Sequence, residues 1–155
     1  MEPVERVLGW ALQLLARRDH SEAGLRSRLE KKGASQEVVA AVLARLSELG
    51  YLDDRRVARQ WAEGLVRGGR GFGPRLKFEL LRRGIPEEVA AEVMAETAES
   101  HDQAELVAAL VARRFCGFDL NTASAKETGR VVGYLQRRGF GIGVIMQVLR
   151  ENKGC

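Results

Sequence analysis

The sequence contains little of what disulfide-rich, metal-binding and membrane proteins require. It has two histidines and two cysteines in 155 residues, with no CxxC or HxxxH spacing. A disulfide framework or a zinc site is therefore not expected, and Cys116 and Cys155 are expected to be ordinary thiols in a reducing compartment. No apolar run approaches the ~18 residues that span a bilayer, and the mixed charges of the first ten residues do not form a secretory signal. We expect a cytoplasmic protein with no membrane partner.

Candidates for catalysis are equally few. His20 stands beside an expected helix cap at Ser21, and His101 opens an expected helix, which are positions typical of exposed or capping histidines. Asp53 and Asp54 also begin an expected helix, where carboxylates satisfy free backbone N–H groups more readily than they chelate a metal. We therefore expect no enzyme, no catalytic residue, no metal, no cofactor and no small-molecule substrate.

The composition favours helices over strands. Alanine and leucine supply 19 residues each, whereas isoleucine and threonine supply three each. Apolar residues recur every three or four positions. The clearest stripes are Val4, Leu8, Leu12 and Leu15, then Val38, Val42, Leu46 and Leu49, then Val57, Trp61 and Leu65. With glycine and proline as punctuation, this pattern predicts nine helices, near 4–17, 21–33, 35–49, 53–67, 74–84, 86–99, 101–115, 125–139 and 141–151. The aromatic residues are expected to serve packing rather than base stacking, namely Tyr51, Trp61, Phe72, Phe78, Phe115, Phe118, Tyr134 and Phe140.

An internal repeat appears when the chain is aligned on Gly33, Gly84 and Gly139. The preceding segments are LRSRLEKKG, LKFELLRRG and VVGYLQRRG, at spacings of 51 and 55 residues. Each has apolar residues eight and four positions before the glycine and a basic doublet directly before it, and a Val/Val/Leu-type stripe follows. This pattern predicts a helix, a turn at positive φ and a second helix that packs back on the first.

A preceding helix would complete a three-helix bundle in each repeat. We therefore expect an all-α fold of three tandem three-helix-bundle repeats, at 1–50, 51–99 and 100–155, in an elongated, curved array. The connection at 115–126 and the segment RGGRGFGP at 67–74 are the expected mobile places, because four glycines in eight residues disfavour helix.

The glycine-rich segment at 67–74 matches neither GxxxxGK[ST] nor GxGxxG, so a nucleotide-binding loop is not indicated. Two interpretations remain open for it. It is either a plain linker or an RGG-like segment whose Arg67 and Arg70 approach nucleic acid.

Positive charge is concentrated in the middle of the chain. The net charge is +4, but residues 65–84 hold six basic side chains and one acidic one, whereas residues 85–105 hold seven acidic and none basic. The basic doublets either complement the dipoles of three helix C-termini or form a positive track on successive repeats. The candidate contacts are Arg67, Arg70, Arg75, Lys77, Arg82, Arg83, Lys31, Lys32, Arg137 and Arg138.

Several spaced motifs resemble the RecX family of bacterial recombination regulators. They are GYLDDRRVARQW at 50–61, GFGPRLKFELLRRGI at 71–85 and RRGFGIGVIMQVL at 137–149, together with the repeats, and the resemblance extends from about residue 4 to 150. It implies three tandem three-helix repeats and a cytoplasmic, non-enzymatic protein that binds the RecA filament on single-stranded DNA. It also implies weak direct binding to that DNA and modulation, in most members inhibition, of the ATPase and strand exchange of RecA in recombination, DNA repair and the SOS response. The ten basic residues above are then the candidate filament contacts.

A competing class is a helix-turn-helix regulator that reads duplex DNA, since each glycine-turned helix pair has about the right size. A recognition helix needs polar and basic residues on its outer face, but the helix after Gly84 reads EEVAAEVMAE and the one after Gly139 is almost uncharged. A third class is an adaptor with protein partners only. No long heptad pattern is present, so a monomer is expected.

Overall fold

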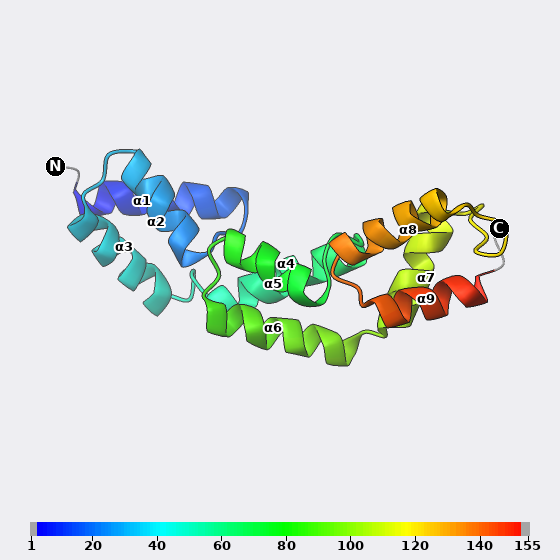
Figure 1. The fold of residues 1–155 in the computed structure, drawn as a ribbon. Coiled ribbons are helices and arrows are strands. Elements are labelled where there is room, and N and C mark those ends of the chain that lie inside the picture. The colour runs from blue at the N-terminus through cyan, green and yellow to red at the C-terminus, as the bar shows by residue number, and fades with distance from the viewer. Residues whose placement is uncertain (1–2, 153–155) are drawn as a thin grey trace. The chain divides into compact units, whose positions relative to one another are not determined.

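The fold is all-α, as the composition and periodicity predict. The computed structural model describes residues 3–152, which form nine α-helices and no strand (Figure 1). The helices are α1 (Val4–Arg17), α2 (Glu22–Lys31), α3 (Gln36–Glu48), α4 (Asp54–Arg67), α5 (Gly73–Arg82), α6 (Glu87–Ser100), α7 (Gln103–Arg114), α8 (Ala125–Arg137) and α9 (Ile142–Glu151). Each coincides with a helix that the sequence predicts. None of the described helices is long and apolar enough to cross a membrane.

Short polar side chains begin several of the helices. The hydroxyl oxygens of Ser21, Ser35 and Ser124 accept hydrogen bonds from the backbone N–H three residues further on, at 3.0, 3.3 and 3.1 Å. The carboxylate of Asp53 makes the same contact at the start of α4, at 3.2 Å, so its interpretation as a cap is confirmed. Asp54 instead accepts a hydrogen bond from the first backbone N–H of α2, at 2.9 Å.

The three glycines of the repeat each end a helix with a left-handed backbone. Their φ angles are 105° at Gly33, 92° at Gly84 and 98° at Gly139, as the repeat predicts. In each case the residue after the glycine donates its N–H to the carbonyl of a leucine five positions earlier, at 3.1 to 3.3 Å. All three leucines are fully buried. The same type of turn therefore follows a buried leucine at the equivalent position of all three repeats.

The apolar columns of the repeat are buried before the glycine in all three copies. These residues are Leu25, Leu29, Leu76, Leu80, Val131 and Leu135. Two of the predicted stripe residues are exposed, since 39% of Leu12 and 59% of Leu49 is accessible, and Val4, Leu8, Leu15 and Trp61 are only partly buried. On α1 the fully buried positions are Val7 and Ala11 instead. A spacing of four residues drifts by about 40° at each step around a helix, so Leu12 has moved off the buried side that faces α2 and α3.

Packing divides the chain into two units. The first comprises the residues up to Trp61 together with Leu80–Ala90, and the second comprises Ala62–Glu79 and the residues from Ala91 onward. In the first unit α1, α2 and α3 pack on one another around a core of valines and leucines, and in the second unit α9 packs against α7 and α8 (Figure 1). The boundary passes through α4, α5 and α6, so these helices contribute to both units.

Each unit contains one hydrogen bond between corresponding positions of adjacent repeats. In the first unit the hydroxyl of Ser21 donates to the backbone carbonyl of Arg83, at 2.8 Å. In the second unit the backbone N–H of Phe72 donates to the carbonyl of Arg138, at 2.9 Å. The donors are 51 residues apart and the acceptors 55, which are the spacings of the repeat. In both pairs of adjacent repeats, the turn before the second helix of one repeat is thus hydrogen-bonded to the basic doublet of the next.

The second of these contacts corrects the expectation of a mobile segment at 67–74. Phe72 is 5% exposed, and its ring stacks on that of Phe140 with centroids 5.4 Å apart. Gly69 is also buried, and a Cβ there would collide with the side chain of Leu110. The glycines allow the backbone to approach its neighbours closely rather than to move freely.

The thiol predicted at Cys116 is also corrected. Cys116 is disulfide-bonded in the structure. The prediction relied on cysteine number and expected compartment, and neither shows whether a given cysteine is oxidised. Cys155 lies outside the described residues.

Candidate functional site

The second cation of the first two basic doublets lies over a tryptophan ring. The ammonium of Lys32 is 5.1 Å from the ring centroid of Trp10, and the guanidinium of Arg83 is 5.4 Å from that of Trp61. Both partners shift by 51 residues from one repeat to the next. Lys32 is also the C-cap residue of α2, so its charge lies where the helix dipole favours a cation. The structure therefore supports the dipole interpretation and adds a cation–π contact to it.

In the third repeat the ring comes from a different position. The residue that corresponds to Trp61 is Cys116, and Arg138 lies instead over Tyr134, 4.5 Å from the ring centroid. Arg138 also donates a hydrogen bond to the hydroxyl oxygen of Tyr134, at 3.0 Å. The guanidinium of Arg114 is 4.9 Å from the same ring. The arrangement of cation and ring is thus kept although the aromatic residue has moved.

The first cation of each doublet is exposed. These residues are Lys31, Arg82 and Arg137. Of the other predicted contacts, Arg70 is exposed and Lys77 is half-buried. In each doublet the first residue is exposed and the second lies over a ring, although Lys32 is also exposed. The common positive track along the repeats stays a prediction.

Two of the predicted arginines are engaged by carboxylates one helical turn away. Arg67 pairs with Glu63 at 2.7 Å, and Arg75 pairs with the buried carboxylate of Glu79 at 2.7 Å. Arg75 also lies over the ring of Phe78, 4.9 Å from its centroid. Both guanidinium groups are held in place, and part of their charge is neutralised before any partner binds.

A groove of about 760 Å³ in the second unit brings two of the predicted cations together. Arg75 and Arg137 line it, and the side chains of Phe78 and Ile142 that face it are 51% and 50% exposed. Packing was the expected role of Phe78 and of Tyr51, and it is wrong for both, since Tyr51 is 53% exposed. The groove therefore combines cations with accessible apolar surface.

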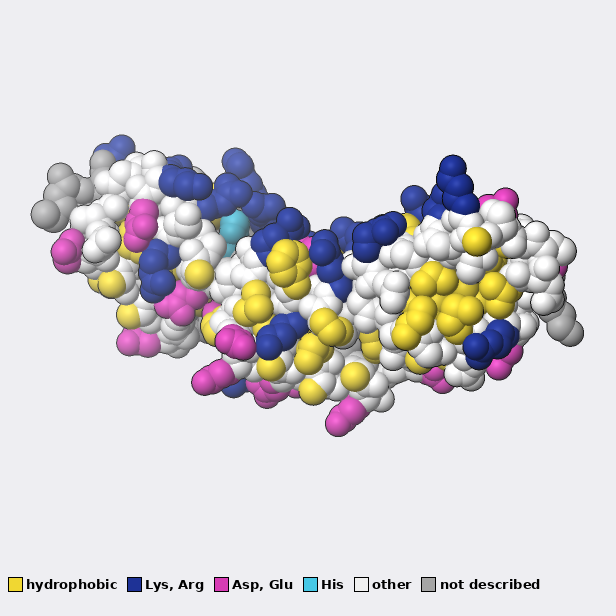
Figure 2. All heavy atoms as spheres, in the orientation of Figure 1, with side chains coloured by type: hydrophobic (Ala, Val, Ile, Leu, Met, Phe, Trp, Pro, Cys, Tyr) yellow, Lys and Arg dark blue, Asp and Glu magenta, His cyan; other side chains and the backbone are white. Residues whose placement is uncertain are grey.

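A second cavity, of about 440 Å³, lies in the first unit where α1 ends and α2 begins. It is lined by Arg18, Asp19, His20, Gly24, Arg28, Trp61 and Arg83. Figure 2 shows Lys and Arg side chains gathered over this part of the molecule. Nothing in the sequence pattern singles out Arg18 and Arg28, because Arg18 follows α1, Arg28 lies on α2 and only the fold brings them to one cavity.

His20 is buried in that cavity, with 6% of its surface exposed, which corrects the expectation of an exposed or capping residue. Burial lowers its pKa below the ordinary 6.5, and the positive charges of Arg18 and Arg28 lower it further. A backbone hydrogen bond at Leu14 and the charge of Asp19 oppose this shift in part. The imidazole is therefore neutral at neutral pH.

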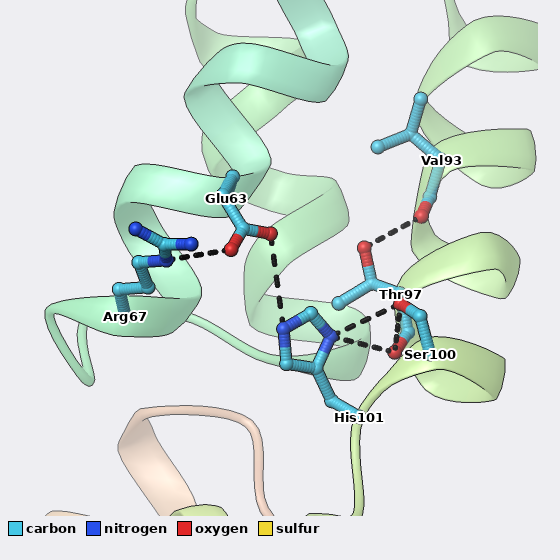
Figure 3. Close-up of polar contacts among 6 residues, drawn as sticks. All are labelled: Glu63, Arg67, Val93, Thr97, Ser100 and His101. Carbon is cyan, nitrogen blue, oxygen red and sulfur yellow. Dashed lines mark hydrogen bonds and ion pairs between the residues drawn. The ribbon is translucent and has the colours of Figure 1, made fainter.

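His101 belongs to a polar cluster at the end of α6 (Figure 3). Its Nε2 lies 3.7 Å from the carboxylate of Glu63, and its Nδ1 lies 3.1 Å from the hydroxyl of Ser100 and 3.3 Å from the carbonyl of Thr97. The carboxylate of Glu63 is shared with Arg67. His101 therefore ties α6 to α4 within the second unit and does not cap α7, whose N-cap is Asp102.

These features define an all-helical protein of repeated modules that holds ordered cations beside aromatic rings and in cavities. Models of the RecX family match it twice, as the first three-helix domain over residues 8–46 and the second three-helix domain over residues 53–94. The chain is 38% identical to the regulatory protein RecX of Syntrophotalea carbinolica over 143 residues, 92% of this chain and 94% of that protein. It is 39% identical to a regulatory protein RecX of Thermus thermophilus over 144 residues, 92% of this chain and 89% of that protein. The chain belongs to the RecX family of regulatory proteins.

Solved structures of the family share the fold. The crystal structure of RecX from Lactobacillus salivarius superposes with a TM-score of 0.78 at 16% identity, over 96% of this chain and 95% of that one. A second crystal structure, of a regulatory protein RecX, superposes with a TM-score of 0.77 at 19% identity, over 94% of this chain and 72% of that one. The resemblance drawn from the sequence motifs is confirmed.

Proposed function

We propose that this chain is a non-enzymatic regulator that binds the RecA filament on single-stranded DNA and inhibits its ATPase and strand exchange. Membership of the RecX family supports a regulatory role, and the resemblance of the motifs implies RecA as the partner. We further propose that the repeats at 1–50, 51–99 and 100–155 act as successive modules, and that the protein works in the cytoplasm as a monomer.

The observation that carries the proposal is the recurrence of the cation–ring pair. Lys32 and Arg83 are held on rings at equivalent positions, so less side-chain freedom is lost when a partner binds. The first cations, Lys31, Arg82 and Arg137, lie at the surface, and we propose that they contact DNA phosphates or acidic surface of RecA.

The experiment is an ATPase assay of RecA on single-stranded DNA with substoichiometric amounts of this protein. We expect a lower rate of ATP hydrolysis and co-sedimentation of the protein with the filament. An unchanged rate together with no co-sedimentation would overturn the proposal. Selection from random duplexes should enrich no sequence motif, because an enriched motif would indicate a helix-turn-helix regulator instead.

A further inference from the structure

We propose that the cavity of the first unit is a phosphate-binding site that takes the phosphodiester backbone of single-stranded DNA. The inference rests on the proposed function in one respect, since it takes single-stranded DNA to be the polyanion that this protein meets. The cavity, of about 440 Å³, falls in the range of small-ligand sites and has room for a phosphate with its neighbouring sugar.

Three guanidinium groups from separate segments line this cavity. Arg18 follows α1, Arg28 lies on α2 and Arg83 follows α5. Arg18 and Arg28 are exposed, and within residues 3–152 neither makes an ion pair with a carboxylate. Arg83 is oriented by Trp61. Arginines without a protein counter-ion, grouped around one concave surface, match the several oxygens of a phosphate group.

The one acidic residue of the lining does not cancel this charge. Asp19 lies 4.0 Å from the guanidinium of Arg56, which is outside the cavity lining, so its carboxylate is partly neutralised from another side. Three arginines and one aspartate leave the lining positive with His20 neutral. The influence of Arg18 and Arg28 on His20 agrees with this geometry, because both charges act at the buried imidazole.

The aromatic residue of the lining favours a nucleic-acid strand over an acidic peptide. Trp61 is half-buried, and it lies beside the arginines rather than in the core. A base next to a bound phosphate can stack on an aromatic side chain, and such contacts tolerate any sequence. An acidic peptide would gain from the arginines but not from the ring. We therefore assign the cavity to a single strand.

The test uses the full chain with Trp10→Phe, so that Trp61 is the only tryptophan. Its fluorescence is followed during titration with a thymidine oligonucleotide at several salt concentrations. The variant Arg18→Gln with Arg28→Gln is compared with Arg17→Gln plus Arg45→Gln. The control pair removes the same charge from exposed positions of the same unit that do not line the cavity.

We expect the cavity variant to bind the oligonucleotide at least tenfold more weakly. The negative slope of log K against log salt should become shallower by roughly 1.4, the value for two phosphate contacts on a single strand. The control should keep the affinity of the parent within about twofold. DNA should also raise the pH at which the His20 imidazole titrates by NMR. Arg18, Arg28, Arg83 and Asp19 line the cavity with that ring, and an anion bound among them favours the protonated imidazole.

Equal weakening by both variants would show that net charge alone matters and would overturn the site. If the cavity variant still binds DNA but no longer binds RecA, the cavity takes an acidic protein segment and the single-strand assignment is overturned. Quenching of Trp61 by inorganic phosphate but not by the oligonucleotide would overturn it as well. If the parent binds DNA through the cavity but leaves the ATPase of RecA unchanged, this inference stands and the proposed function fails.

Discussion

The guanidinium of Arg83 lies over the indole ring of Trp61, 5.4 Å from its centroid, while the backbone carbonyl of the same arginine accepts a hydrogen bond from Ser21. One residue thus joins three segments of the first unit. The basic doublets are therefore structural as well as electrostatic elements, and their two positions should respond differently to substitution.

A double-mutant cycle measures the contact between Arg83 and Trp61. Arg83→Gln and Trp61→Leu, alone and combined, should show a coupling energy of about 0.5–1 kcal/mol in urea unfolding, as expected for a cation over a ring. A second cycle with Arg82→Gln in place of Arg83→Gln should give a coupling near zero. Equal coupling in the two cycles would contradict the assignment of separate roles within the doublet.

Ser21 should matter more than other helix caps. Its hydroxyl accepts the capping bond of α2 and donates to the carbonyl of Arg83, whereas Ser35 makes only a capping bond. Ser35→Ala should cost about 1 kcal/mol of unfolding free energy, and Ser21→Ala should cost about 1 kcal/mol more, because the second hydrogen bond is lost in a buried place. Thermal or urea unfolding of the two variants provides the comparison, and a smaller loss for Ser21→Ala would rule out the second bond.

Gly139 and Gly33 test close packing separately from backbone strain. Both have positive φ, so alanine at either position carries a strain of roughly 1–2 kcal/mol. Nothing surrounds a Cβ at Gly33, whereas a Cβ at Gly139 would collide with the carbonyl of Phe72. Gly139→Ala should therefore lower the melting temperature more than Gly33→Ala does. Equal melting temperatures would mean that Phe72 is not held against Gly139 in solution.

The stability of the first unit should depend on pH through His20. The pKa of this imidazole is lowered in the folded state, first by burial and then by Arg18 and Arg28, so the unfolded chain takes up a proton that the folded chain does not. The stabilisation is complete above the ordinary pKa of 6.5 and decreases as the pH falls from there toward the lowered value. Urea unfolding between about pH 5 and pH 7.5 should show this decrease, and His20→Gln should flatten it. An unchanged slope in the variant would exclude His20 as its cause.

Much of the fold could be predicted because its signals are local. Helix periodicity, the serine before α2 and the glycine after α2, α5 and α8 each act within a few residues. The repeat added information beyond the local pattern, since Leu29 and its counterparts in the other two repeats were expected to occupy equivalent buried positions. Leu12 was misplaced because a stripe drawn with a constant spacing of four ignores the drift around the helix.

The site could be predicted only in part, because its contacts join distant segments. Nothing local distinguishes Arg18 and Arg28 from other surface arginines, and no composition argument shows that Phe72 packs on Phe140. Mobility is the wrong expectation for the segment at 67–74, because glycine permits both free motion and close approach and the sequence does not show which applies. The doublets could be found from sequence, but the rings beneath their second residues could not.

The most direct test of a regulator that acts through the exposed doublet residues is the ATPase of RecA on single-stranded DNA with two triple variants. The first variant combines Lys31→Gln, Arg82→Gln and Arg137→Gln. It should need at least tenfold more protein for half-inhibition, and its inhibition should depend less on salt, since three exposed cations are lost. The control variant, which combines Arg17→Gln, Arg45→Gln and Arg150→Gln, should inhibit the ATPase of RecA as strongly as the unmodified protein does. Equal inhibition by the two triple variants, or no inhibition by the unmodified protein, would contradict the account.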